Sequence, residues 1–205
     1  MTNVGIPDPC LVVLLGASAS GKSTFAARHF APTEVVSSDH CRALVGDDEN
    51  DMRVTSEAFA LLHFIAATRL ALGRLTVVDA TNVQADARAP LLRLAREHNV
   101  TPVAIVLDMP ERVCLERNRE RPDRHLGAHV IHRHVAMLRR SIGALEGEGF
   151  REVAVLRTPS DALAAEIVRE PGRTDPSDER RASGVAGADR PLESEPVDPP
   201  VPRRR

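Results

Sequence analysis

The stretch "GASASGKST", residues Gly16 to Thr24, decides the fold of this chain of 205 residues. Directly before it runs "CLVVLL" (residues 10–15), an apolar segment of a length typical of a buried strand, and residues 23–29 after it have a helix-like composition. The stretch fits the pattern GxxxxGK[ST] at the point where a strand turns into a helix. Such loops bind the phosphates of a nucleotide, and the alternative interpretation is a glycine turn before a helix.

The residue types in this loop match the chemistry of phosphate binding. Glycines at positions 16 and 21 let the backbone curl so that N–H groups point inward, and the following helix adds its positive end. We expect Lys22 to reach the β- and γ-phosphates of ATP and the Ser23 hydroxyl to bind Mg²⁺. The predicted ATP-binding residues of the loop are Gly16, Ala17, Ser18, Ala19, Ser20, Gly21, Lys22, Ser23 and Thr24.

Lys22 is the single lysine of the chain, and the other members of its 27 lysines and arginines are all arginine. A compact ammonium on a thin stem fits where the backbone closes tightly around a charge, whereas a wide guanidinium does not. The exception therefore predicts a catalytic role for Lys22 in a narrow site.

Short β-branched segments alternate with helix-like segments from residue 10 to residue 170. This alternation predicts an α/β fold, a doubly wound parallel sheet of about five strands with helices on both faces and a small helical lid. The ligand site is then expected beyond the C-terminal ends of the strands. The predicted strands are residues 10–15, 34–38, 75–79, 102–108 and 152–156. The predicted helices are residues 23–29, 54–72, 85–98, 111–119 and 128–145.

Residues 171–205 differ in composition from the rest. They contain seven of the 15 prolines, and seven arginines balance seven acidic residues. Such a segment buries too little apolar surface to offset its ordering entropy, so we predict a disordered tail. A linker, or a tail ending in "RRR" that touches nucleic acid, is the alternative.

Composition excludes several classes of protein. The net charge is −2 and the aromatic residues are five phenylalanines, which argues against a protein that coats long nucleic acids or stacks single strands. No run of 18 apolar residues and no signal-like N-terminus is present, so we expect no membrane contact. Three widely spaced cysteines are typical of a reducing compartment, and we expect a cytoplasmic protein.

Polar residues at two further strand ends are candidates for binding the second substrate, the molecule whose hydroxyl would accept a phosphate. Asp39 follows the predicted second strand in "SSDHCR", where a carboxylate could accept the proton of an attacking hydroxyl; capping a helix is the alternative role. Asp79 and Asn82 follow the third strand in "VVDATN"; Asp79 could bind Mg²⁺ through water and Asn82 could contact substrate, or Thr81 or Asn82 could cap the next helix. A GTPase is disfavoured because DxxG and NKxD motifs are missing.

Several arginines cluster in "ERNRERPDR" at a helix end broken by Pro122. Arg117, Arg121 and Arg124 are four and three residues apart, so they could share one face and close over a triphosphate as a lid. The alternative is a salt-bridged surface helix. His125, His129 and His132 also have helical spacing, and a zinc site there is a weaker alternative because no carboxylate or cysteine joins them closely.

Taken in order, these motifs and the segments "DDEND" (47–51) and "LRRSIGALEGEGF" (138–150) resemble a known family. Residues 10–158 resemble the kinase module of bacterial polynucleotide kinase-phosphatases and, more broadly, phage-type 5′-hydroxyl polynucleotide kinases. The resemblance implies a P-loop kinase that transfers the ATP γ-phosphate to 5′-OH ends of RNA or DNA, and we expect the kinase domain to span residues 1–170. It implies that Lys22 and Ser23 are phosphate and metal ligands and that Asp39 is the general base. Arg42 would contact the first internucleotide or 3′ phosphate, and Arg117, Arg121 and Arg124 would form the lid.

The resemblance stops short of the whole family architecture, in which phosphatase and nucleotidyltransferase domains follow the kinase. The chain is then a stand-alone kinase, has separate phosphatase or ligase proteins as partners, or is part of a longer protein. Two competing functions are a small-molecule kinase acting on an antibiotic, sugar or nucleotide hydroxyl, and a non-catalytic nucleotide-binding module. The scarce aromatics and negative charge favour the small-molecule kinase, and the acceptor-side motif opposes it.

Overall fold

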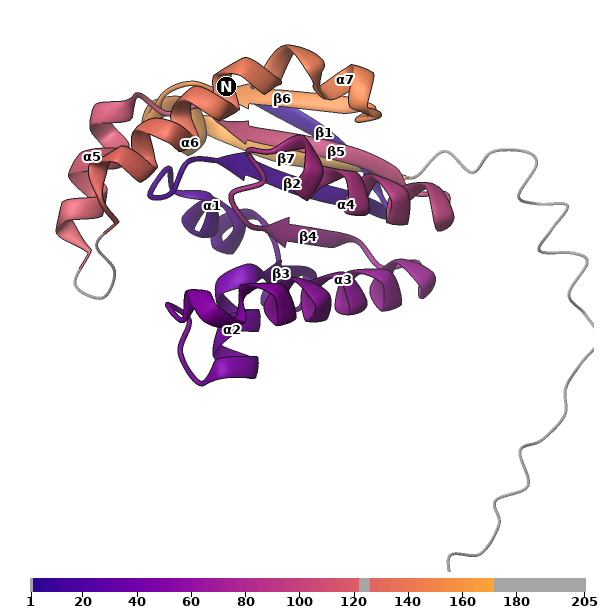
Figure 1. Ribbon diagram of the computed structural model, residues 1–205. Helices are drawn as coiled ribbons and strands as arrows, with labels where there is room; N and C mark the ends of the chain where they lie inside the picture. The colour runs from indigo at the N-terminus through magenta and orange to yellow at the C-terminus, as the bar shows by residue number, and fades with distance from the viewer. Residues whose placement is uncertain (1, 122–125, 172–205) are drawn as a thin grey trace, which may run out of the picture. The chain divides into compact units, whose positions relative to one another are not determined.

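The computed structural model describes residues 2–121 and 126–171 and has at its centre a five-stranded sheet in which every pairing is parallel (Figure 1). The strand order is β3-β4-β2-β5-β6. The predicted doubly wound α/β fold is confirmed, and each of the five predicted strands is present with shifts of one residue at the ends. The strands are β2 (Cys10–Gly16), β3 (Val35–Ser37), β4 (Thr76–Asp79), β5 (Thr101–Leu107) and β6 (Glu152–Leu156).

Helices cover both faces of this sheet because alternate strand residues point to opposite sides. On β2, Val12 and Leu14 face one apolar core and Val13 and Leu15 face the other. The first core also receives residues of α1 and α5, and the second receives residues of α3 and α4. The helices are α1 (Lys22–His29), α2 (Ser38–Gly46), α3 (Thr55–Ala71), α4 (Ala85–Glu97), α5 (Glu111–Glu120), α6 (Ala128–Ser141), α7 (Leu145–Glu148) and α8 (Pro159–Ala164).

Short 3₁₀ turns complete the helical segments, and one of them interrupts a predicted helix. The segment expected to be helical over residues 128–145 ends as α6 at Ser141, and the turn η3 (Ile142–Ala144) leads into α7. The other two turns are η1 (Pro32–Glu34) and η2 (Met52–Val54). None of the described helices is long and apolar enough to span a membrane.

A second, two-stranded parallel sheet joins the start of the chain to the end of its described part. Its strands are β1 (Thr2–Asp8) and β7 (Ala165–Pro171), and the sequence patterns did not predict them. Val4 and Ile6 of β1 lie in the first apolar core, and Arg169 of β7 donates two hydrogen bonds of 2.8 Å to the Glu34 carboxylate. The predicted tail begins at Pro171, the last residue of β7, and its other residues lie outside the described part.

The strand order determines which residues meet at the C-terminal edge. Because β4 lies between β3 and β2, the residue nearest to the loop after β2 on that side is Asp79, and Asp39 lies one strand further away. The chain leaves β2 toward β3 and later crosses to β5 on the other side of β2. In open α/β sheets the ligand crevice lies beyond such a switch point.

Candidate active site

The loop after β2 is curled as the glycine pattern predicts. The Gly16 N–H donates to the Thr81 carbonyl over 3.0 Å, and a Cβ at Gly16 would lie 2.5 Å from Ser20 Oγ. Gly21 has φ +100°, and Ala19 has φ 63°, a left-handed conformation that residues with a Cβ seldom adopt. The glycines are therefore sterically required, and Ala19 holds backbone strain inside the loop.

Lys22 lies in a narrow space and contacts its own loop. Its Nζ donates to the carbonyl oxygens of Gly16 and Ala17 over 3.0 and 2.9 Å, and the residue is 8% exposed. Burial lowers the pKa of the ammonium, while the carboxylates of Asp79 and Asp39 counteract that shift. The ammonium is thus buried and held by two backbone carbonyls, and its catalytic role stays a prediction.

Asp79 and Ser23 form a hydroxyl–carboxylate pair next to this lysine. Asp79 ends β4 and is buried, which raises its pKa, while Lys22 and a hydrogen bond from the Ser23 hydroxyl lower it. Mg²⁺ prefers hard oxygen ligands such as a hydroxyl, a carboxylate and phosphate oxygens. The side chains of Ser23 and Asp79 line the same cavity and fit that requirement, so Asp79 is a candidate second protein group for the metal ion expected at Ser23.

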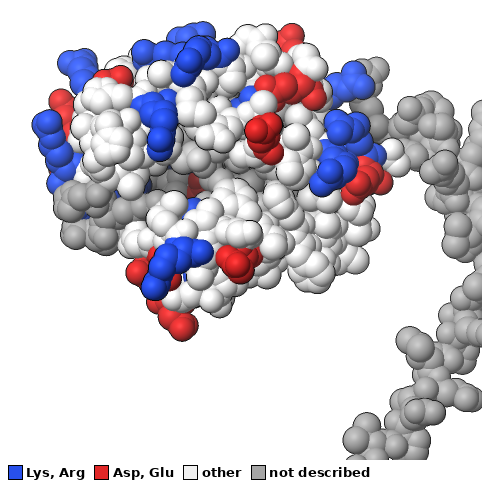
Figure 2. Space-filling view, viewed as in Figure 1, with Lys and Arg blue, Asp and Glu red and all other residues white. Residues whose placement is uncertain are grey.

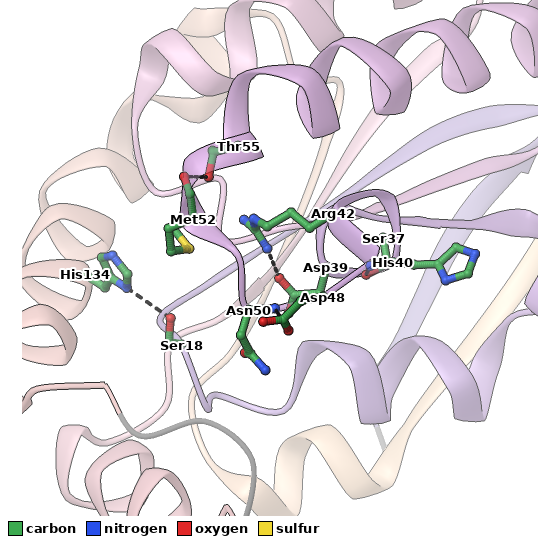
Figure 3. A network of polar contacts seen from close by, with 10 residues as sticks. All are labelled: Ser18, Ser37, Asp39, His40, Arg42, Asp48, Asn50, Met52, Thr55 and His134. Carbon is green, nitrogen blue, oxygen red and sulfur yellow. Dashed lines mark hydrogen bonds and ion pairs between the residues drawn. The ribbon is translucent and has the colours of Figure 1, made fainter. Parts of the chain in front are cut away.

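Asp39 and Arg42 lie on the first turns of α2 and form an ion pair (Figure 3). Ser37, not Asp39, is the N-cap of this helix, because the His40 N–H donates to Ser37 Oγ. Arg42 is buried, with its side chain 6% exposed, and its Nε has no hydrogen-bond partner among the described residues. The capping role considered for Asp39 therefore belongs to Ser37, and the Asp39 carboxylate faces Arg42.

A cavity of about 410 Å³ brings these groups together with residues of α6. Lys22, Ser23, Asp39, Arg42 and Asp79 all line it. In Figure 2 it opens as a groove between the part of the molecule with α2 and α3 and the part with α5 and α6. The further lining residues used below are Met52, Phe59, Leu126, Val130, Arg133 and His134.

Another cavity, of about 400 Å³, lies on the other side of the phosphate loop against α1, α5 and α8. Its walls are mainly apolar, with Phe25, Leu107 and Met109 among them. Arg117 of α5 lines it and donates to the Ser20 carbonyl over 3.0 Å. Arg121, directly after α5, lines both cavities.

Three predicted site residues are placed differently or lie outside the described part. Asn82 is buried and absent from the lining of both cavities; its amide donates to the Leu14 carbonyl over 2.8 Å. Its position supports the backbone and does not present it to a substrate, and α4 is capped by Gln84 without a side-chain hydrogen bond. Arg124 and His125 lie outside the described residues. Among those described, no group of three potential metal ligands occurs, and His132 pairs with Glu111 over 2.5 Å.

Sequence patterns missed the contribution of α6 to this site. His134 Nδ1 lies 3.3 Å from Ser18 Oγ on the phosphate loop, and Figure 3 shows the two side chains facing each other across the cavity from Arg42. Val130, Arg133 and His134 are three or four residues apart and line the same cavity. Helical spacing reveals such a shared face, but nothing in the sequence indicates that it lies against the loop.

The AAA domain family matches residues 11–145, which is more than half of the chain. The chain belongs to the AAA domain family. This AAA domain protein has the ATP-binding P-loop kinase type of fold, with its phosphate loop, Asp79, Asp39 and α5 all inside the matched residues. No curated protein matches the chain in sequence at a significant level.

Several solved structures share this fold. A chain of the Pnkp1/Rnl/Hen1 RNA repair complex superposes with a TM-score of 0.58 at 23% identity, covering 66% of this chain and 46% of that one. A gluconokinase from Sinorhizobium meliloti 1021 gives 0.50 at 17%, covering 78% and 92%. The AvrRxo1-ORF1:-ORF2 complex with ATP gives 0.52 at 17%, covering 68% and 50%. At these identities the likeness establishes the fold alone, and our AAA domain chain corresponds to less than half of the RNA repair chain.

Proposed function

We propose that the protein transfers the γ-phosphate of ATP to the 5′-hydroxyl end of a polynucleotide, RNA or DNA. The observation that carries this proposal is the Asp39–Arg42 pair in the cavity that also contains Lys22. A carboxylate there can accept a proton from a hydroxyl, and the buried guanidinium has an Nε donor left over from its pair with Asp39 to which a phosphate oxygen can be the acceptor. A polynucleotide end offers a hydroxyl and a phosphate together.

The donor side of the proposal uses the apolar cavity against α1, α5 and α8. Its volume and walls suit a nucleoside, and its polyphosphate would extend along the phosphate loop toward Lys22. Arg117 is anchored on the loop carbonyl of Ser20, and Arg121 lines both cavities. Arg121 is therefore suited to contact the phosphoryl group as it passes from donor to acceptor.

The proposed reaction is an in-line displacement. A lone pair of the acceptor's 5′-oxygen forms a bond to the γ-phosphorus while its proton passes to the Asp39 carboxylate. The bond between the γ-phosphorus and the bridging oxygen breaks, and ADP leaves with that electron pair. Lys22 and Arg121 stabilise the charge on the transferred group. Mg²⁺ held by Ser23 and Asp79 would neutralise charge on the phosphate oxygens.

A small-molecule acceptor is the second candidate, and the apolar part of the cavity lining favours it. Met52, Phe59, Leu126 and Val130 give the acceptor cavity apolar surface, and the gluconokinase that shares the fold shows that such scaffolds serve small substrates. The Arg42 Nε donor, which is not used in the pair with Asp39, would then bind an acceptor atom of the small molecule. Separate phosphatase or ligase proteins remain proposed partners, supported by the fold likeness to a chain of an RNA repair complex.

The test offers both acceptor classes to the full chain at once. The protein is incubated with γ-labelled ATP and Mg²⁺, with 5′-OH oligonucleotides of RNA and DNA beside a pool of small hydroxyl metabolites. We expect label on the oligonucleotide 5′ end, and no label when the end already carries a phosphate. Label only on a small molecule would replace the polynucleotide assignment with the second candidate.

A further inference from the structure

Arg88 of α4 is a fully buried cation that the proposed reaction does not use. Its exposed fraction is 0%, and it lines neither of the two cavities. Nε and Nη2 donate to the two carboxylate oxygens of Glu148 on α7, over 2.7 and 2.5 Å. The third nitrogen, Nη1, donates to the backbone carbonyl of Asn82 over 2.8 Å. The guanidinium thus joins two helices to the segment after β4.

That segment is tied by two hydrogen bonds to the end of β2, where the phosphate loop begins. The Asn82 side chain donates to the Leu14 carbonyl of β2 over 2.8 Å, and the Thr81 carbonyl accepts from the Gly16 N–H over 3.0 Å. Asn82 has φ 48°, a left-handed conformation that persists only when its surroundings hold it. The start of the phosphate loop is therefore positioned by residues 81 and 82.

The same segment carries Asp79, which lines the cavity of the proposed metal site together with Lys22 and Ser23. A displacement of residues 79–82 would move this carboxylate and the Gly16 end of the loop together. Shifts of about 1 Å in such groups are enough to cost on the order of 10²-fold in rate. Residues 79–82 therefore connect Arg88 to the groups of the proposed reaction site.

The pair of Arg88 and Glu148 is better explained by the position in which it holds the Asn82 carbonyl than by a gain in the stability of the fold. An apolar pair of similar volume is often as stable as a buried ion pair, because the pair's attraction only offsets the cost of desolvation. What an apolar side chain lacks is a donor for the Asn82 carbonyl. A guanidinium binds a carboxylate with two nitrogens and still directs a third donor elsewhere, which lysine cannot do with comparable rigidity.

We propose that Arg88, oriented by Glu148, is a positioning residue for phosphotransfer. It fixes residues 79–82 and through them Asp79 and the start of the phosphate loop. This inference rests on the proposed function for its kinetic readout only, since the positions of residues 79–82 and of the loop can be followed without any acceptor.

The test uses two variants and a matched control in the full chain. Glu148→Gln keeps the shape of the Glu148 side chain and removes only its negative charge, and Arg88→Met with Glu148→Met replaces both partners by apolar side chains. Arg93→Met is the control, since Arg93 lies on the same helix in an exposed pair with Glu97 at 3.8 Å. The measurements are kcat, KM for ATP, thermal melting, and amide hydrogen exchange of peptides covering residues 14–21 and 79–83.

We expect the Arg88→Met, Glu148→Met double variant to fold. Its kcat should be lower by about tenfold or more, and its KM for ATP should change by less than about threefold. Amide exchange should accelerate in both peptides and stay unchanged in β5, while Arg93→Met matches the parent in every readout. Glu148→Gln leaves the buried Arg88 without its carboxylate, so it should melt at a lower temperature and show the same changes in kcat and exchange; it keeps the test valid if the double variant does not fold.

An apolar pair with parental kcat and parental exchange in residues 79–83 would overturn the proposal and leave Arg88 a purely structural residue. If the parent transfers phosphate to no acceptor, the proposed function fails by itself. Exchange in the two peptides then still decides whether Arg88 positions the loop.

Discussion

At the scale of single residues, the lone lysine has a structural explanation. Lys22 Nζ lies between two carbonyl oxygens of its own loop in a buried channel, next to the carboxylate of Asp79. A guanidinium is planar and carries five donors, so it would need more space than the ammonium between these two carbonyl oxygens. We therefore expect the width of the side chain at position 22 to matter as well as its charge.

The substitution Lys22→Arg should therefore impair phosphotransfer severely although the charge is kept. A guanidinium would push the γ-phosphate out of line or withdraw to solvent, and a shift of about 1 Å can cost on the order of 10²-fold in kcat. The measurement is kcat of the purified variant, with circular dichroism for folding and Arg93→Lys on exposed α4 as control. A folded Lys22→Arg protein with nearly parental kcat would make the lone lysine an accident of composition.

Asp39→Asn tests the proposed general base. The amide keeps the shape of the side chain but cannot accept the hydroxyl proton as a carboxylate does, so kcat should fall by about 10²–10⁴-fold while ATP binding is retained. Asp47→Asn is the matched control, because Asp47 is exposed at the end of the same helix and asparagine tolerates its left-handed φ of 58°. Phosphotransfer at the parental rate would remove Asp39 from the mechanism.

At the scale of elements, α5 brings its arginines to the loop from one side. Arg121 lines both cavities and Arg117 bonds to the loop, whereas Arg119 between them is exposed and lines neither. Arg121→Ala should lower kcat by about 10²-fold and weaken ATP affinity much less, because a charge over the transferred group acts mainly on the transition state. Arg119→Ala should leave both quantities unchanged. Weakened ATP binding with parental kcat would assign Arg121 to binding alone.

The stabilisation contributed by the ion pair between Glu34 of η1 and Arg169 of β7 depends on pH. Arg169 lowers the pKa of Glu34 by hydrogen bonding to its carboxylate, so this stabilisation is fully present above the ordinary pKa of 4.5 and is lost as the pH falls through the lowered value of the folded state. Glu34→Gln should reduce the free energy of unfolding by about 1 kcal/mol or less at neutral pH, and the difference should shrink in acid. Urea unfolding over a pH series measures this, with exposed Glu49→Gln as control; a difference that grows in acid contradicts the assignment.

The elements that the sequence predicted are those with a local signal. The five strands of the large sheet are apolar and β-branched, and the phosphate loop follows from its glycines and Lys22. β1 and β7 contain Gly5, Pro7 and exposed polar residues, and they pair only with each other across nearly the whole domain, so no local pattern marks them.

The parts of the site that sequence missed are contacts between distant segments. The left-handed Asn82, the hydrogen bond between Ser18 and His134, and the buried pair of Arg88 and Glu148 each depend on how elements pack. Asp79 was recognised as a candidate, but its contact with Ser23 needed the order of β3, β4 and β2. The spacing of apolar residues shows which face of a helix or strand is buried, but it does not show which other element packs against that face.

At the scale of the whole molecule, the charges are nearly balanced. The net charge is −2, and the seven arginines of residues 171–205 offset the seven acidic residues there, so the rest of the chain also carries −2. On the face in Figure 2, basic and acidic side chains lie among one another. A net charge this close to zero argues against binding of a long polyanion by charge alone, and Lys22, Arg42, Arg121 and Arg133 line one cavity.

Binding to 5′-OH oligonucleotides should accordingly depend only modestly on salt and little on strand length beyond a few nucleotides. Each phosphate neutralised by the protein contributes about one unit to the slope of log K against log salt, and a cavity with few cations can neutralise only a few phosphates. Fluorescence anisotropy with strands of increasing length, each at several salt concentrations, measures the slope and the affinity. A strand with a 5′-phosphate is the control, since it fills the same length but lacks the hydroxyl that the Asp39 carboxylate would accept from. Affinity that rises steadily with length, with a slope that steepens in step, would mean that the strand follows a surface outside the cavity and that binding of the end alone is wrong.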